Sequence, residues 1–211
     1  MDFLVNGVPF DPSSMTVTDS FGVKMSVSRL RFFLAKPWFL DDNGDTVATF
    51  PSTYLLPSLF ENGQVVTLGQ VDAHLHTMGF LIGLDSATNH ADPLQWTEAP
   101  LTDATMHWGW NPAVGYQFVQ VEGRFDQNGD GIVNTSDPNF FYHCGGDVLL
   151  TEKQLEVHTD ADAGGTVVIT LACEVGDVFR GIDVVQDPVG EVPSPLTRRV
   201  VDNLKNAITH P

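Results

Sequence analysis

One stretch of the chain carries oxygen-bearing side chains at the spacing of a calcium-binding loop. Within residues 126–137, aspartate, asparagine and aspartate fall at positions 1, 3 and 5, and Gly131 falls at position 6, where such loops turn sharply. The predicted ligands are Asp126, Asn128, Asp130, the Ile132 carbonyl, Asn134 and Asp137. Because calcium is held by several oxygen atoms at once, we predict a Ca²⁺ site here.

The last position of this loop is Asp137 in place of the usual glutamate. That pattern resembles the dockerin-type loop more than the loop of a calmodulin-type sensor. It favours a static ion that holds a long connection in shape. The alternative to a calcium site is an ordinary acidic turn. Neither interpretation assigns an activity, so the chemistry has to be sought in other residues.

Histidines form the second candidate site. Four of the seven are grouped with other potential ligands: His74, His76, His107 and His143. His74 and His76 would point to one face of an extended strand, and imidazoles from separate segments can converge on one ion. Nitrogen ligands without a set of thiolates favour copper or zinc, between which the spacing does not decide. The other three are interpreted as solvated: His90, His158 and His210.

Aromatic and sulfur side chains flank these histidines. Trp108 and Trp110 follow His107 closely, and they either plug the core or line the metal site. Cys144 adjoins His143 and can be a soft ligand, although a buried or disulfide-bonded cysteine is the commoner outcome. With Cys173 as the second cysteine, the chain has either one disulfide or two free thiols.

The elements that must position these residues are predicted to be strands. Apolar residues at 23, 25 and 27 shift to 30, 32 and 34, which indicates a strand with a bulge, closed by a turn at 41–45. Further strand-like runs cover 64–68, 77–84, 116–125, 154–157 and 166–175, and long loops are expected at 85–105 and 126–147. The predicted fold is all-β, a sandwich or barrel-like antiparallel domain.

A single helix is predicted at the C-terminus. Ser194 is suited to cap it and Pro195 to occupy its first position. The apolar residues of its inner face recur every fourth position: Leu196, Val200, Leu204 and Ile208.

Length and charge limit the possible functions. The 211 residues, 42% of them hydrophobic, suit a single domain over 1–211 with the calcium loop as an insertion at 126–137. A net charge of -17 repels nucleic acid and anionic membranes. No apolar run is long enough for a spanning helix. The start at Met1 resembles an initiator placed before a mature chain, so a removed signal peptide and a periplasmic or secreted location are expected.

Several motifs together resemble the MbnP family of extracytoplasmic copper-binding proteins, which are related to the methanotroph proteins CorA and MopE. They occur in this order: Phe80-Leu81-Ile82-Gly83-Leu84-Asp85 with Asn89, Met106-His107-Trp108-Gly109-Trp110, Gly115-Tyr116, Val121-Glu122-Gly123, and His143-x-Gly145. The resemblance extends from the strand at 29–32 to the segment at 175–179 and the terminal helix.

The resemblance implies a β-sandwich that binds one copper ion through histidines. In some members a tryptophan oxidised to kynurenine adds a ligand, and a di-haem partner protein of the MbnH and MauG type performs that oxidation. Carried onto this chain, the family positions are Trp108, Trp110 and His143, while His74 and His76 are proposed as further ligands from their grouping.

The predicted function is therefore copper acquisition, storage or handling by a binding protein rather than an enzyme, with calcium as a structural ion. One alternative is a mononuclear copper oxidoreductase, although no Ser-His-Asp order, paired catalytic carboxylates or phosphate loop stands out. Another is a calcium-stabilised adhesion or carbohydrate-binding module, which exposed tryptophans on one face would favour.

Overall fold

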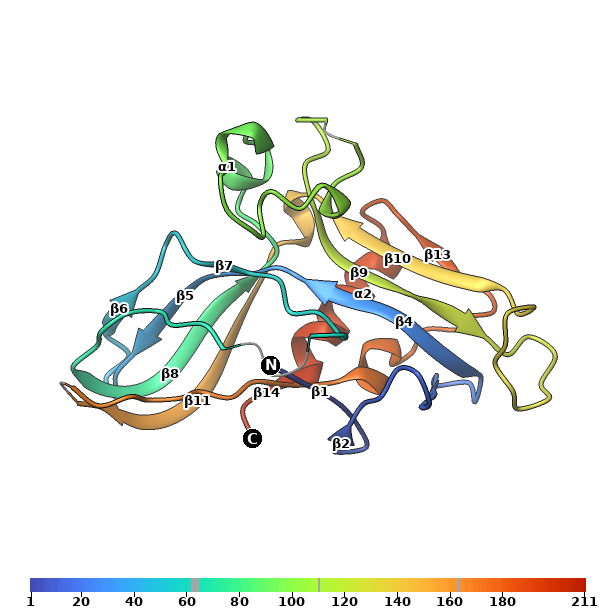
Figure 1. Cartoon of the computed structure of the whole chain (residues 1–211), viewed down its shortest axis with the longest axis horizontal. Coiled ribbons are helices and arrows are strands. Elements are labelled where there is room, and N and C mark those ends of the chain that lie inside the picture. Colours follow the sequence, from blue (N-terminus) through green and yellow to red (C-terminus); the bar gives the residue numbers. More distant parts are fainter. Residues whose placement is uncertain (62–64, 110, 163) are drawn as a thin grey trace.

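The computed structural model describes residues 1–61, 65–109, 111–162 and 164–211. Its strands form three sheets, and a helix near the C-terminus lies among them (Figure 1). The predicted all-β class with a C-terminal helix is confirmed. Aromatic rings fill much of the core, including those of Phe32, Phe33, Phe118 and Phe140, all of which are fully buried.

The sheet on the right of Figure 1 carries the calcium-type loop. In order of pairing, it consists of β13 (Val189–Gly190), β10 (Asn139–Gly145), β9 (Gln117–Phe125), β4 (Lys24–Phe32) and β3 (Val17–Thr18). Because β9 and β10 are antiparallel neighbours, residues 126–138 form the connection of a hairpin.

The sheet on the left of Figure 1 carries most of the candidate histidines. Its order is β11 (Thr151–Ala161), β8 (Ala73–Ile82), β5 (Leu34–Leu40) and β6 (Thr46–Thr49), with β7 (Tyr54–Leu55) also paired to β5. The pairs β11–β8, β8–β5 and β5–β6 are all antiparallel.

The third sheet joins the two ends of the chain. Its order is β14 (Ile208–Thr209), β12 (Ala172–Glu174), β1 (Asp2–Val5) and β2 (Val8–Pro9). The short helical pieces are α1 (Ser86–Asn89) and the 3₁₀ turns Pro93–Gln95, Ala104–Met106, Asp147–Leu149 and Val175–Phe179. Among the described residues, no helix has the length and apolar character needed to cross a membrane.

The predicted slip in the first long strand is confirmed. The pairing of β4 with β9 shifts between Val27 and Arg29, so the buried side chains change from odd to even positions at this point. Only Phe33 separates β4 from β5, and the chain therefore runs almost directly from one sheet into the other. This continuity links the sheet of the calcium-type loop to the sheet of the histidines (Figure 1).

The terminal helix α2 (Pro195–Ala207) begins as predicted. The Ser194 hydroxyl accepts a hydrogen bond from the Thr197 amide at 3.2 Å, and the Thr197 hydroxyl accepts one from the Ser194 amide at 2.9 Å. This reciprocal capping satisfies amides that the first turn leaves without a helical partner. The helix buries Val200 and Leu204, and it contacts β10, β11 and β12.

Three sequence predictions about elements were wrong. The run at 64–68 is described from residue 65 on, and residues 65–68 form no strand. In the run at 166–175, the strand is limited to β12. Val65 and Val168 are 83% and 69% exposed, so apolar composition there does not reflect burial in a sheet. The loop expected at 126–147 ends at residue 138, because Asn139–Gly145 forms β10.

A glycine in β8 makes room for a tryptophan of the neighbouring strand. Trp38 on β5 lies directly opposite Gly79, and a Cβ on Gly79 would lie 2.1 Å from the Trp38 ring. We expect Gly79→Ala to lower the free energy of unfolding by about 2 kcal/mol through overpacking, measured by urea denaturation. Adding Trp38→Leu should recover part of that loss, whereas additive losses in the double variant would contradict the clash.

Candidate metal centre

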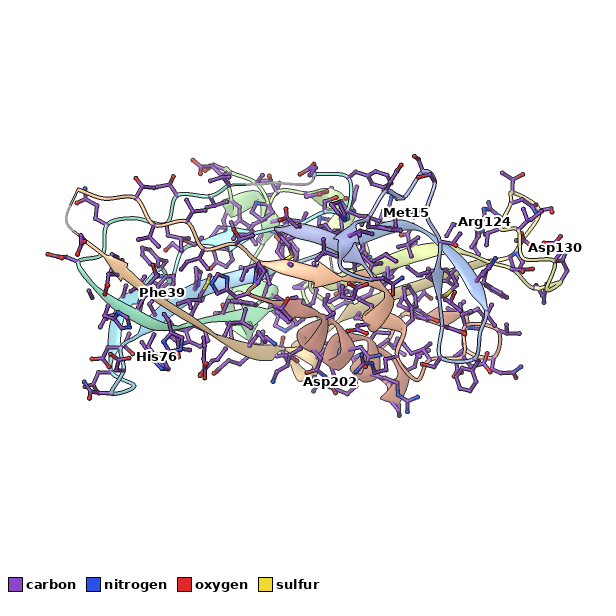
Figure 2. All side chains as sticks on the ribbon, turned by 90° about the horizontal axis from the view of Figure 1, so that it is seen from below. Met15, Phe39, His76, Arg124, Asp130 and Asp202 are labelled. Carbon is purple, nitrogen blue, oxygen red and sulfur yellow. The ribbon has the colours of Figure 1, made fainter. Side chains whose placement is uncertain are left out.

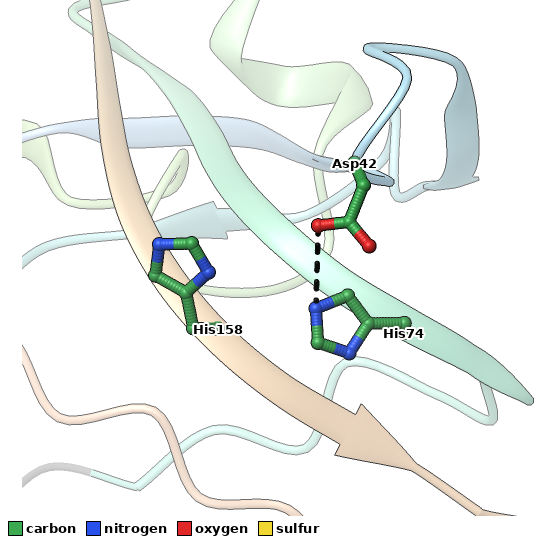
Figure 3. A group of neighbouring side chains, drawn as sticks. All are labelled: Asp42, His74 and His158. Carbon is green, nitrogen blue, oxygen red and sulfur yellow. Dashed lines mark ion pairs between the residues drawn. The ribbon is translucent and has the colours of Figure 1, made fainter.

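Three side chains from three separate segments meet at one end of the sheet formed by β11, β8, β5 and β6. They are Asp42 from the turn after β5, His74 from β8 and His158 from β11 (Figure 3). One ligand atom of each lies within 4.8 Å of the others, and within the described parts of the chain no other three histidine, cysteine or carboxylate residues form such a group.

An irregularity in β11 brings His158 into this group. Thr159 pairs with Leu75 and Glu156 pairs with Thr77, so two residues of β11, Val157 and His158, occupy the space opposite His76. His158 takes a backbone φ of +38°. A bulge with one residue in the left-handed region turns a side chain away from regular alternation. Here it turns the imidazole toward β8.

The turn between β5 and β6 supplies Asp42. The Asp41 carboxylate accepts hydrogen bonds from the amides of Asn43 and Asp45, both at 2.9 Å, which holds the turn in shape. Asp42 stays exposed and its Oδ1 lies 3.6 Å from Nε2 of His74. A carboxylate is thereby available beside an imidazole nitrogen.

His74 lies between two carboxylates. Its Nδ1 is 2.7 Å from Oδ1 of Asp160, and its Nε2 faces Asp42. The hydrogen bond to Asp160, with further attraction from Asp42 and Asp41, raises the pKa of His74. A raised pKa means that protons compete with a metal ion for the ring over a wider pH range. The side chains of His74 and His158 are 37% and 55% exposed, so the group is open to solvent.

His76 lies next to the group. It is two residues from His74 on β8, and its ring centroid is 4.3 Å from that of His158 in an edge-to-face arrangement. Its Nδ1 lies 2.9 Å from the Thr77 hydroxyl. The structure therefore gathers His74, His76 and His158 on one part of the β8–β11 pair.

The structure does not bring His143 or His107 to this group. His143 lies on β10, in the other five-stranded sheet, with Nε2 2.8 Å from Oε1 of Glu122. That carboxylate also accepts a hydrogen bond from Arg29 at 2.6 Å. His107 follows a 3₁₀ turn, forms a β-bridge with Tyr116 and makes an edge-to-face ring contact with it at 5.8 Å.

The tryptophans are packed against the fold. Trp38 lies over Gly79, and Trp108 lies close to Gly145, where a Cβ would come within 2.8 Å of its ring. Trp108 and Trp96 are both half-buried. Trp110, the second candidate for modification, lies outside the described residues. Within the described chain, neither Trp38 nor Trp108 has the full exposure expected of a stacking platform for a carbohydrate.

The predicted calcium loop is organised by its own carboxylates. Asp126 accepts hydrogen bonds from the amides of Gly129 and Gly131 at 2.8 and 2.7 Å, and Asp137 accepts one from the Asn134 amide at 2.8 Å. Gly131 has a φ of +82°, which explains the glycine at the sharp turn. Asp126 and Asp137 are only 8% and 6% exposed, although both lie in a hairpin connection.

The middle of this loop is bonded in the same way. Asn128 accepts a hydrogen bond from the Asp130 amide at 3.0 Å, and Asp130 accepts one from the Ile132 amide at 2.8 Å. The carboxylates of Asp126, Asp130 and Asp137 do not form a group within 4.8 Å of one another. Asp130 and His76 lie toward opposite ends of the long axis, so the loop and the histidine group are separate (Figure 2).

Both cysteines are free and buried. Cys144 is on β10 and Cys173 on β12, in different sheets. Burial raises the pKa of Cys144 to about 12 and also raises that of Cys173. Of the two possibilities that the sequence left open, one disulfide or two free thiols, the structure has two free thiols.

Sequence reasoning missed two members of the histidine group. His158 was interpreted as a solvated histidine, and Asp42 as part of a turn only. The signal for His158 was that it directly follows the strand-like run at 154–157, but its approach to His74 depends on β11 pairing with β8 and on the bulge. Neither this strand pairing nor the bulge can be predicted from the spacing of residues along the chain.

Comparison with known proteins gives one family and one solved structure. The structure of "MbnP from Methylosinus trichosporium" is similar over 84% of this chain and 75% of that chain, with 12% sequence identity and a TM-score of 0.49. No curated protein matches the chain. The family model named MbnP matches residues 1–194, which is most of the 211 residues. The chain therefore belongs to the MbnP family.

Proposed function

We propose that this protein binds copper outside the cytoplasm and serves in copper acquisition, storage or handling. The observation that carries the proposal is the group of Asp42, His74 and His158. Two imidazoles and one carboxylate are ligands that suit copper or zinc better than calcium or magnesium. Membership in the MbnP family, taken with the resemblance noted in the sequence, supports copper as the ion.

In this proposal His74 and His158 supply nitrogen ligands and Asp42 supplies an oxygen ligand. His76, whose ring touches that of His158, is the next available donor. Copper bound at so exposed a site can exchange with solvent and other carriers, which suits a protein that receives and releases the ion. His143 and His107 belong to other parts of the fold and take no part. The di-haem partner and the modified tryptophan stay predictions.

We further propose that residues 126–137 bind calcium as a structural ion. The spacing of the oxygen-bearing side chains along residues 126–137 supports this. The low exposure of Asp126 and Asp137 is already compensated by the amide hydrogen bonds that they accept. Asp130 and Asn128 have to move toward these two carboxylates to complete the oxygen shell, since the carboxylates of Asp126, Asp130 and Asp137 do not lie within 4.8 Å of one another. The role assigned to this ion is to hold the β9–β10 connection.

Elemental analysis of the purified protein tests the copper proposal. After dialysis against copper and then buffer, we expect about one copper ion per chain in the wild type and equally in His143→Ala. Wild-type protein that retains no copper would overturn the proposal, and loss of copper in His143→Ala would move the site to β10.

A further inference from the structure

Asp160 makes the shortest polar contact to any histidine of the candidate metal centre. It lies directly opposite His74 in the antiparallel pair of β11 and β8, and its Oδ1 is 2.7 Å from Nδ1 of His74. By comparison, Oε2 of Glu156 is 3.5 Å from Nε2 of His158, which is long for a hydrogen bond. Asp160 comes after the bulge, where the regular register has resumed.

This contact determines which nitrogen of His74 carries the proton. A neutral imidazole has one N–H donor and one nitrogen with a free lone pair. A carboxylate can only accept, so the hydrogen bond requires Nδ1 to carry the proton and leaves the lone pair on Nε2. Nε2 is the nitrogen that faces Asp42, at 3.6 Å from its Oδ1. The ring is thereby presented to the candidate ligand group in the one form that can bind an ion there.

We propose that Asp160 is a positioning residue for the metal centre, which holds His74 in the Nδ1–H form and orients Nε2 toward the ion. This inference rests on the proposed function. Asp160 does not itself bind the metal. Partners of this kind fix the tautomer and the ring orientation of a ligating histidine, and their loss costs about 10- to 100-fold in metal affinity.

Three substitutions separate positioning from general charge. Asp160→Ala removes the acceptor, Asp160→Asn keeps an acceptor oxygen without the charge, and Asp162→Asn removes an equal charge from an exposed neighbour on the same segment. We expect copper affinity, measured by competition with a chelator, to fall about 10- to 100-fold in Asp160→Ala. Asp160→Asn should recover most of the affinity, and Asp162→Asn should resemble the wild type.

The second readout needs no metal. Nitrogen NMR of the metal-free protein, recorded at alkaline pH where the ring is neutral, reports which nitrogen of His74 is protonated. We expect the Nδ1–H form in the wild type, in Asp160→Asn and in Asp162→Asn, and a shift toward the Nε2–H form in Asp160→Ala. Unchanged tautomers in Asp160→Ala, or an affinity loss no larger than in Asp162→Asn, would overturn the inference. A wild type that binds no copper would overturn the proposed function, and the NMR result would still decide the tautomer.

Discussion

Replacing His158 with asparagine is expected to lower the copper affinity about 100-fold or more while leaving the fold intact. The substitution removes one of the two imidazoles in the group of Asp42, His74 and His158, and losing a direct ligand should cost at least as much as losing a supporting residue. Isothermal titration, or competition with a chelator, measures the loss. An affinity equal to that of the wild type would exclude His158 as a ligand.

Asparagine is chosen because of the backbone at this position. His158 has a φ of +38°, a region that asparagine tolerates and β-branched residues avoid. His158→Val should therefore lose copper equally and also lose about 1 to 3 kcal/mol of unfolding free energy. The matched pair separates ligand loss from backbone strain, since only the valine variant should lose stability. Equal stability of the two variants would contradict the assigned strain at His158.

Removing calcium with a chelator is expected to lower the melting temperature of the wild type and to change that of Asp126→Asn much less. An ion present at about 100 times its Kd stabilises the folded state by about 2.7 kcal/mol. For a chain of this length, that corresponds to about 5 to 10 °C. Asp126 is the first ligand of the predicted loop and is buried, so its neutralisation should remove most of the calcium-dependent shift.

For each variant, the quantity to compare is the difference in melting temperature between samples with calcium and samples with a chelator. The melting temperature alone is not enough, because Asp126 also accepts hydrogen bonds from Gly129 and Gly131. Losing one of these acceptors changes stability without any ion. Asp162→Asn serves as the control of equal charge and should keep the wild-type shift. If the melting temperature of the wild type is the same with calcium and with a chelator, residues 126–137 form an acidic turn and the calcium proposal fails.

Local patterns predicted several elements well, because their causes are local. The alternation from Val23 to Leu34, with its slip, corresponds to β4, its bulge and the start of β5. The cap at Ser194 and the proline at the start of α2 were equally readable, since a helix end is satisfied by neighbours in sequence. The returning hydrogen bond to Thr197 was not predicted. The strand at 139–145 was missed because the polar loop before it and the glycines after it resemble one long loop.

By itself, the sequence determined the all-β class, the C-terminal helix and the spacing of His74 and His76, because alternation, capping and i, i+2 geometry act over a few residues. It also determined the oxygen-rich pattern of residues 126–137. The tertiary structure alone decided that Asp42 and His158 join His74 and that His143 and His107 do not. The reason is that pairing between β8 and β11, a bulge and a turn bring together three residues that are 32 to 116 positions apart in the sequence, and strand register is not encoded in spacing along one strand.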